Sequence, residues 1–110
     1  MAWKILSNAE QIKGIIEDSK LRPQLFFKHS TRCSISTMAL NRFEKSGILS
    51  NETMDCWYLD LLAYRQISSE IETLTKVIHQ SPQAILVYNE HVLYSESHGM
   101  IDSAEILKIV

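Results

Sequence analysis

Runs of apolar residues predict the strands of this chain. The run Leu25-Phe26-Phe27, inside residues 24–29, is typical of a strand that is buried on both faces. We therefore expect residues 24–29 to form the central strand of a sheet. The other predicted strands are residues 3–6, 54–59, 84–88 and 92–94, the last two flanking a hairpin turn at Asn89-Glu90-His91.

Apolar residues that recur every three or four positions predict helices between these strands. The expected helices cover about residues 8–19, residues 34–46, a segment that opens at Ser69 and has Ile71, Leu74 and Ile78 on one side, and a segment from Ser103 to about residue 110. Ser7 and Ser69 each precede a glutamate by three residues, which is the spacing of a capping box, and Ser103 is a candidate cap. Gly47 is typical of the position that follows a helix.

The order of these elements predicts an α/β fold. A helix lies between each of the first three strands and the next, whereas the last two strands follow one another directly. Parallel strands need crossover helices and a hairpin is antiparallel, so we expect a mixed central sheet with helices on both faces. A length of 110 residues fits one domain, residues 1–110.

Charge and composition exclude several classes of function. Eleven basic and thirteen acidic residues leave a net charge of -2, and the basic residues are scattered, so we expect no nucleic-acid partner. No stretch approaches the roughly 18 apolar residues of a membrane span. Two cysteines do not make a disulfide framework, and four dispersed histidines do not make a metal site. This pattern is typical of a protein of the reducing cytoplasm.

Cys33 is the candidate reactive group. It stands between the predicted central strand and the helix that follows, where free N–H groups and the helix dipole favour a thiolate, the form of cysteine that attacks disulfides. Arg32 and Lys28 are expected to add positive potential if they turn toward the sulfur. Ser36 lies one helical turn on, where its hydroxyl is expected either to donate to the thiolate or to have no catalytic effect. The alternative for Cys33 is an inert buried cysteine.

Ser36 also bears on how a disulfide at Cys33 would be resolved. A second cysteine at this spacing would make a dithiol C-x-x-C motif, but a serine cannot form a disulfide. The resolving sulfur must come from a small thiol or from a partner protein. Cys56 is an unsuitable partner for Cys33 because it lies about 13 Å back along its predicted strand, at a rise of about 3.3 Å per residue. We expect Cys56 to be a core residue, with a peripheral thiol as the alternative.

Two positions carry a resemblance to the thioredoxin fold. Cys33 begins the helix after the central strand, and Pro82 precedes the final hairpin, where that fold has a cis-proline. The segments Thr31-Arg32-Cys33-Ser34-Ile35-Ser36, His79-Gln80-Ser81-Pro82-Gln83 and Ser97-His98 resemble the monothiol bacilliredoxin family more narrowly. That family commonly has proline after its cysteine, and this chain has Ser34. The resemblance implies a thioredoxin-like three-layer α/β/α fold with a mixed central sheet.

The resemblance also implies roles for residues around Cys33. A cis Pro82 would aim the Ser81 backbone at the cysteine and leave a polar edge for an extended substrate. The implied substrate-binding residues are Thr31, Ser81, Pro82, Gln83 and His98. Gln83 is otherwise a solvent-facing strand residue, and His98 an ordinary surface histidine. Of the remaining histidines, we expect His29 to lie under the active-site loop, whereas His79 and His91 are loop residues.

The expected activity follows from the same resemblance. It implies a monothiol thiol-disulfide oxidoreductase that removes bacillithiol from S-thiolated cytoplasmic proteins through Cys33. Bacillithiol or another low-molecular-weight thiol would be its co-substrate, with no bound cofactor. Two alternatives stay open: a transferase for another small thiol, and a non-catalytic thioredoxin-fold module that holds protein partners.

Overall fold

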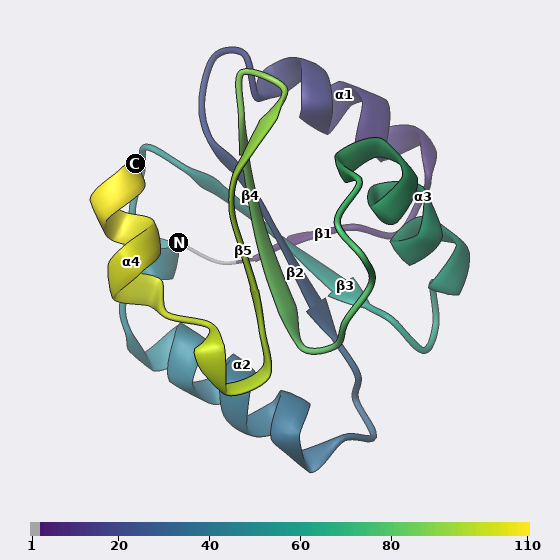
Figure 1. Ribbon diagram of the computed structural model, residues 1–110, viewed down its shortest axis with the longest axis vertical. Coiled ribbons are helices and arrows are strands. Elements are labelled where there is room, and N and C mark those ends of the chain that lie inside the picture. The colour runs from purple at the N-terminus through teal and green to yellow at the C-terminus, as the bar shows by residue number, and fades with distance from the viewer. Residues whose placement is uncertain (1–2) are drawn as a thin grey trace.

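The computed structural model describes residues 3–110, which form a five-stranded mixed sheet (Figure 1). The strands are β1 (Lys4–Ile5), β2 (Gln24–His29), β3 (Asp55–Asp60), β4 (Gln83–Tyr88) and β5 (His91–Ser97). Their order across the sheet is β1-β3-β2-β4-β5, so β2 is central, as predicted. β1 and β2 run parallel to β3, whereas β4 runs antiparallel to β2 and to β5.

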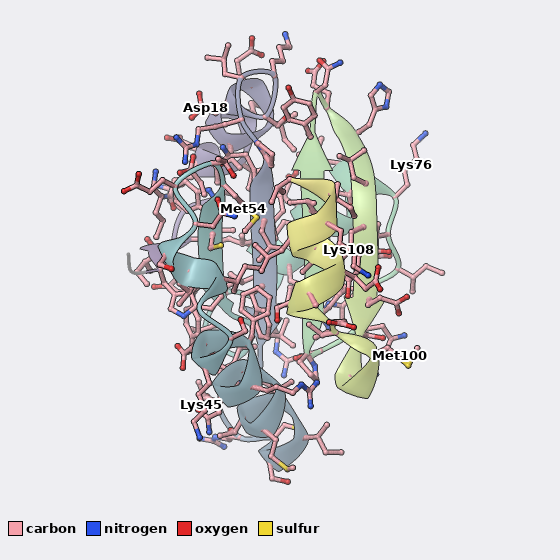
Figure 2. All side chains as sticks on the ribbon, turned by 90° about the vertical axis from the view of Figure 1, so that its left-hand side faces the viewer. Asp18, Lys45, Met54, Lys76, Met100 and Lys108 are labelled. Atoms are coloured by element: carbon pink, nitrogen blue, oxygen red, sulfur yellow. The ribbon has the colours of Figure 1, made fainter. Side chains whose placement is uncertain are left out.

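Four helices cover the two faces of the sheet. They are α1 (Glu10–Asp18), α2 (Ser34–Lys45), α3 (Arg65–Thr75) and α4 (Ser103–Ile109), with two short 3-10 turns, η1 (Ile48–Ser50) and η2 (His98–Met100). α1 and α3 lie on one side of the sheet and α2 and α4 on the other (Figure 1). Figure 2 looks onto the α2 and α4 side, where Met100 of η2 points away from the protein and is 70% exposed. No helix among residues 3–110 has the length and apolar character needed to cross a membrane.

Every residue of β2 is buried, because this strand has a helical layer on each side. Leu25 and Phe27 join the core beneath α2 and α4, whereas Phe26 joins the core beneath α1 and α3. The Phe27 ring lies 5.0 Å from the ring of Phe43 on α2, centroid to centroid. Full burial of side chains of this size contributes about 1.5–3 kcal/mol each, so β2 is held from both faces.

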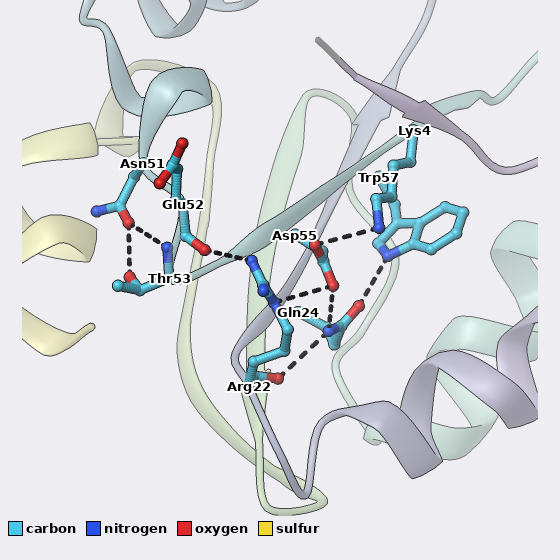
Figure 3. Close-up of polar contacts among 8 residues, drawn as sticks. All are labelled: Lys4, Arg22, Gln24, Asn51, Glu52, Thr53, Asp55 and Trp57. Carbon is cyan, nitrogen blue, oxygen red and sulfur yellow. Dashed lines mark hydrogen bonds and ion pairs between the residues drawn. The ribbon is translucent and has the colours of Figure 1, made fainter. Parts of the chain in front are cut away.

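Asp55 fixes the start of β3 (Figure 3). It pairs with Gln24, the first residue of β2, and so lies at the end of the sheet away from Cys33. Its carboxylate accepts a hydrogen bond from Gln24 Nε2 at 2.8 Å and pairs with Lys4 Nζ at 3.2 Å and Arg22 Nε at 3.3 Å. Gln24 in turn accepts from Trp57 Nε1 at 2.9 Å. Burial acts to raise the pKa of Asp55, but Gln24, Lys4 and Arg22 together lower it below its ordinary value. The cluster therefore depends on an ionised Asp55.

Several helix starts differ from the sequence predictions. Neither predicted capping box forms: Ala9 is the N-cap of α1, and α3 begins at Arg65, four residues before Ser69. Asn8 and Gln11 share the capping contacts at α1: Asn8 Oδ1 accepts from the N–H of Glu10, the first helical residue, and Gln11 Oε1 reaches back to the N–H groups of Ser7 and Asn8.

Two further predictions about the helices are wrong. α3 ends at Thr75, so Ile78 lies beyond the helix, and both Leu74 and Ile78 are exposed whereas Ile67 and Ile71 are buried. At α4, Asp102 rather than Ser103 is the cap, because its carboxylate accepts from Ala104 N.

Candidate functional site

Cys33 occupies the N-cap of α2, as predicted, and its residue is partly exposed. Its backbone N–H donates to Ser30 O at 3.2 Å, which closes the turn between β2 and α2. Its carbonyl accepts from Thr37 N at 3.0 Å and from Thr37 Oγ1 at 3.2 Å. These bonds hold the Cys33 backbone at the start of the helix, where the N–H groups of the first turn point toward its side.

Ser36 does not serve as a donor to the Cys33 thiolate, which corrects one of the two roles expected for it. Its side chain is fully buried, and its Oγ lies 2.7 Å from His29 Nδ1 and accepts from Ser30 N at 3.0 Å. Ser30 then accepts from Cys33 through its carbonyl. The hydroxyl thus ties the end of β2 to the first turn of α2, and it positions the cysteine through the backbone.

His29 lies under the active-site turn, as predicted, and is 5% exposed. Burial lowers the pKa of His29, against the attraction of Asp60 and Glu44. The ring is therefore neutral at pH 7, and it meets the Ser36 hydroxyl without burying a charge.

The two cationic neighbours expected beside Cys33 are placed differently from one another. Arg32 and Thr31 are exposed in the turn before the cysteine, so both stay candidates for contacts with substrate. The prediction that Lys28 adds positive potential at Cys33 is wrong. Its side chain is fully buried and its amine lies on the α3 side of the sheet, 3.3 Å from Ser68 O and 3.3 Å from His79 Nδ1. Strand alternation explains this, since Lys28 and His29 point to opposite faces.

The segment around Pro82 emerges at the same edge of the sheet as Cys33. Lys28 of β2 pairs with Gln83 of β4, so the residues that follow Lys28 and precede Gln83 leave the sheet together. The Ser81–Pro82 peptide bond is cis, as expected. Ser81 Oγ is buried and has no hydrogen-bond partner among residues 3–110.

His98 lies beside this segment. Its backbone N–H donates to Pro82 O at 3.0 Å, and it adopts a positive φ of 55° at the start of η2. The residue itself is exposed. The structure thus brings Pro82 and His98 together, and the imidazole of His98 is free to meet a bound molecule.

Gln83 is contradicted as a substrate-binding residue. It is 3% exposed, and its amide bonds within its own loop, with Nε2 donating to Ile78 O at 3.1 Å and Oε1 accepting from Gln80 N at 3.4 Å. The first strand position after Pro82 faces inward, so Gln83 shapes the loop and cannot reach a substrate.

Cys56 is a core residue, as predicted. It is 6% exposed among the side chains beneath α2, and it pairs with Leu25 in the sheet, eight residues before Cys33. Burial raises the pKa of its thiol to about 12. Both cysteines are free, and residues 3–110 hold no group of side chains suited to a metal ion.

Sequence reasoning missed two buried polar contacts near the site. They are the bond between His29 and Ser36 and the bond between Lys28 and His79. One signal was present, because Lys28 and His29 end a strand predicted to be buried on both faces, and buried polar groups need partners. The partners lie 7 and 51 residues away in the chain, and only the fold brings the second pair together.

Comparison with known proteins places this geometry in a family. The family model described as monothiol bacilliredoxin BrxC matches residues 4–106. The chain belongs to the monothiol bacilliredoxin family. Cys33, the cysteine at the start of α2, stays our candidate for the single thiol that the description of the family implies.

Solved structures agree on the fold. A protein described as a proposed oxidoreductase with a thioredoxin fold is 33% identical, with a TM-score of 0.80 over 94% of this chain and 89% of that one. Thioredoxin of Malassezia sympodialis is 17% identical, with a TM-score of 0.73 over 98% and 87%. Mitochondrial thioredoxin 3 of Saccharomyces cerevisiae is 14% identical, with a TM-score of 0.71 over 98% and 92%. The predicted thioredoxin-like fold is confirmed.

Proposed function

We propose that this bacilliredoxin removes bacillithiol from S-thiolated proteins through Cys33 alone. The observation that carries the proposal is the isolation of Cys33. It is partly exposed at a helix N-terminus, the position of a resolving cysteine is a buried serine held by His29, and Cys56 lies in the core. A thiol in this setting exchanges with external sulfur and not with a partner in its own chain.

The reaction consists of two thiol-disulfide exchanges. The Cys33 thiolate attacks the bacillithiol sulfur of the mixed disulfide, so a new S–S bond forms at Cys33 as the old one breaks. The protein substrate leaves as a thiolate and takes up a proton from water. A second thiol then attacks the disulfide at Cys33, forms a disulfide with bacillithiol and returns Cys33 to its reduced form. No bound cofactor takes part, since each incoming thiol supplies the electron pair.

The proposed substrate surface lies around the cysteine. Thr31 and Arg32 are exposed on one side, and the partly exposed Ser81 and the exposed His98 lie on the other, next to the buried Pro82. The exposed His98 is the side chain we assign to contacts with the bound thiol or the protein segment that carries it, whereas the partly exposed Ser81 would contribute its backbone, because its hydroxyl is buried. We propose that the reaction takes place in the cytoplasm, because free thiols suit a reducing compartment.

A defined test uses a protein that carries one bacillithiol on one cysteine. Intact-mass analysis after mixing with this protein should show the loss of bacillithiol from the substrate and its gain on Cys33. Because Ser36 cannot expel it, the adduct should persist until an added thiol clears it.

The matched control variants separate the two cysteines. Cys33→Ser should take up no bacillithiol, whereas Cys56→Ser should behave like the wild type. An adduct on Cys56, or a substrate that keeps its modification, would refute the proposal. Transfer from a substrate carrying a different small thiol, with none from the bacillithiolated one, would favour a transferase for another thiol. Binding without any transfer would favour the non-catalytic module.

A further inference from the structure

Lys28 is a lysine in an unusual place. Its side chain is 0% exposed in the central strand, although lysine is among the residues least often buried. Its amine has two partners on the α3 side of the sheet, the backbone carbonyl of Ser68 at 3.3 Å and the His79 ring at 3.3 Å. Ser68 Oγ lies 2.9 Å from the same ring nitrogen. The thiol chemistry at Cys33 does not use this cluster directly.

The contact with Lys28 requires one state of His79. A lysine ammonium group has three donors and no acceptor, so Nδ1 must accept for the contact to form, and the proton of the neutral ring then sits on Nε2. In the other tautomer Nδ1–H would donate to Ser68 Oγ, and the contact with Lys28 would be lost. A protonated ring would place an Nδ1–H against the ammonium group, and the contact with Lys28 would be lost.

The cluster joins the two segments that build the site. Lys28 lies five residues before Cys33, and His79 lies three residues before Pro82. Lys28 also pairs with Gln83 in the sheet, so the contact reinforces the register at the edge from which both segments leave. The far side of the Pro82 loop is bound to the backbone of His98.

We propose that Lys28 and His79 are positioning residues, which hold the Ser81–Pro82 segment in place relative to Cys33 for as long as His79 is neutral. The proposal rests on the proposed function, because thiol transfer is the step that the positioning serves. Protonation of His79 breaks the contact with Lys28, frees the loop before Pro82 and slows transfer. The contact between Lys28 and His79 therefore makes the rate of thiol exchange fall more steeply at acid pH than protonation of Cys33 alone would.

The charged groups around the cluster support this assignment. Burial lowers the pKa of His79, and Lys28 and Arg65 lower it further, whereas Glu72 raises it. Burial lowers the pKa of Lys28 to about 8, against the attraction of Glu72. Glu72 also accepts from the His79 backbone N–H at 3.2 Å. Near neutral pH the ring is therefore uncharged and Lys28 is largely charged, which is the pairing that the geometry requires.

His79→Asn is the decisive variant, because its side-chain oxygen can replace Nδ1 as an acceptor and does not titrate. The rate of bacillithiol transfer to Cys33 is measured for the variant and for the wild type between pH 5.5 and 8. The ratio of the two rates removes the thiolate dependence that both share. We expect a ratio near one at pH 7.5 that rises severalfold as the pH falls through the pKa of His79, which lies below its ordinary value. His91→Asn, in the exposed hairpin, should give a constant ratio.

Lys28→Met separates positioning from stability. Lys28→Met removes the cost of burying a charge, but it also leaves the Ser68 carbonyl and His79 Nδ1 without this donor, so its two effects on stability oppose one another. We therefore expect the free energy of unfolding in urea to change little, while transfer at pH 7.5 slows about threefold or more. A residue that only stabilised the fold would lose stability and rate together, and that result would overturn the proposal.

The tautomer gives a readout that needs no activity. Nitrogen NMR of the imidazole at pH 7.5 should show His79 protonated on Nε2, and a ring protonated on Nδ1 would overturn the proposal. If the wild type transfers no thiol at any pH, the proposed function fails and the positioning role fails with it. If the wild type transfers thiol but the ratio for His79→Asn stays constant, only the positioning role fails.

Discussion

Replacement of Ser36 by alanine tests whether its hydroxyl acts through the backbone or on the thiolate. The hydroxyl is fully buried and satisfies two groups, His29 Nδ1 at 2.7 Å and Ser30 N at 3.0 Å. Ser36→Ala leaves both without this partner, and a buried polar group left unpaired costs about 1–3 kcal/mol. Because two groups lose a partner and the hydroxyl leaves only a small void, we expect a loss of about 2–3 kcal/mol in the free energy of unfolding.

Urea denaturation followed by far-UV circular dichroism measures this loss, and the matched control lies on the same helical turn. Ser34 is exposed and makes no side-chain hydrogen bond among residues 3–110, so Ser34→Ala should change stability by less than about 0.5 kcal/mol. The reasoning is refuted if Ser36→Ala is as stable as Ser34→Ala. A loss of stability with the predicted size would assign Ser36 to the architecture of the turn.

Four further outcomes follow from the same contacts. Ser36→Cys should form a disulfide with Cys33 on mild oxidation, detected by peptide mapping, since it restores the C-x-x-C spacing; full labelling of both thiols would argue against it. The pKa of Asp55 is lower in the folded protein than in the unfolded chain, so its ionised form stabilises the fold above the unfolded pKa, and this stability is lost as the pH falls through the folded pKa. Asp55→Asn should therefore lower the free energy of unfolding by about 1 kcal/mol at pH 7, and urea titrations should show that its stability depends less on pH in the acid range. Iodoacetamide at pH 8 should label Cys33 alone in the folded protein, because burial raises the pKa of Cys56 to about 12, and both cysteines after unfolding. Arg32→Gln should slow thiol transfer about threefold at low salt but not near 1 M salt, because salt screens the exposed charge of Arg32. Equal slowing at both salt concentrations would show that Arg32 does not act through its charge.

The sheet and its helices could be predicted because the relevant signals are local. Leu25-Phe26-Phe27 is an unbroken apolar run, and only a strand with helices on both faces buries such a run completely. Gly47 ends α2 with a φ of 83°, a conformation that glycine adopts without cost. Cys33 could be placed at the start of α2 for the same reason, since the strand and the helix signals adjoin there.

Helix starts were harder to predict because neighbouring side chains offer the same spacing. Ser7 and Glu10 have the spacing of a capping box, but Asn8 and Gln11 have it too, and in the structure Asn8 Oδ1 accepts from Glu10 N while Gln11 Oε1 accepts from Asn8 N. At α3, Ile67 and Ile71 pack against the sheet, and the helix begins at Arg65, four residues before the serine of the predicted capping box. Most of the stability of a helix in a protein comes from packing of its apolar face, and a local motif weighs less.

The partners of the polar side chains of the site could not be predicted, because the direction of each side chain depends on the sheet. Gln83 and Lys28 are partners across two antiparallel strands, and both turn inward to bonds within the protein. From the sequence, each is as well suited to solvent or to a substrate. When one face of a sheet is buried and the other is exposed, the alternation of apolar and polar residues shows which way each side chain points. Both faces of this sheet are covered by helices, so that signal is missing.

Side chains alternate between the two faces of a strand, and this explains how the neighbours Lys28 and His29 hold different parts of the site, the Pro82 loop and the Cys33 turn. His29 points to the α2 face and meets Ser36, which holds the turn that carries Cys33. Lys28 points to the α3 face and meets His79, which holds the loop that leads to Pro82. Because the two side chains leave the same strand one residue apart, any shift of β2 moves both anchors at once. The relative placement of the thiol and the proline loop is therefore a property of β2 itself, the most deeply buried strand of the protein.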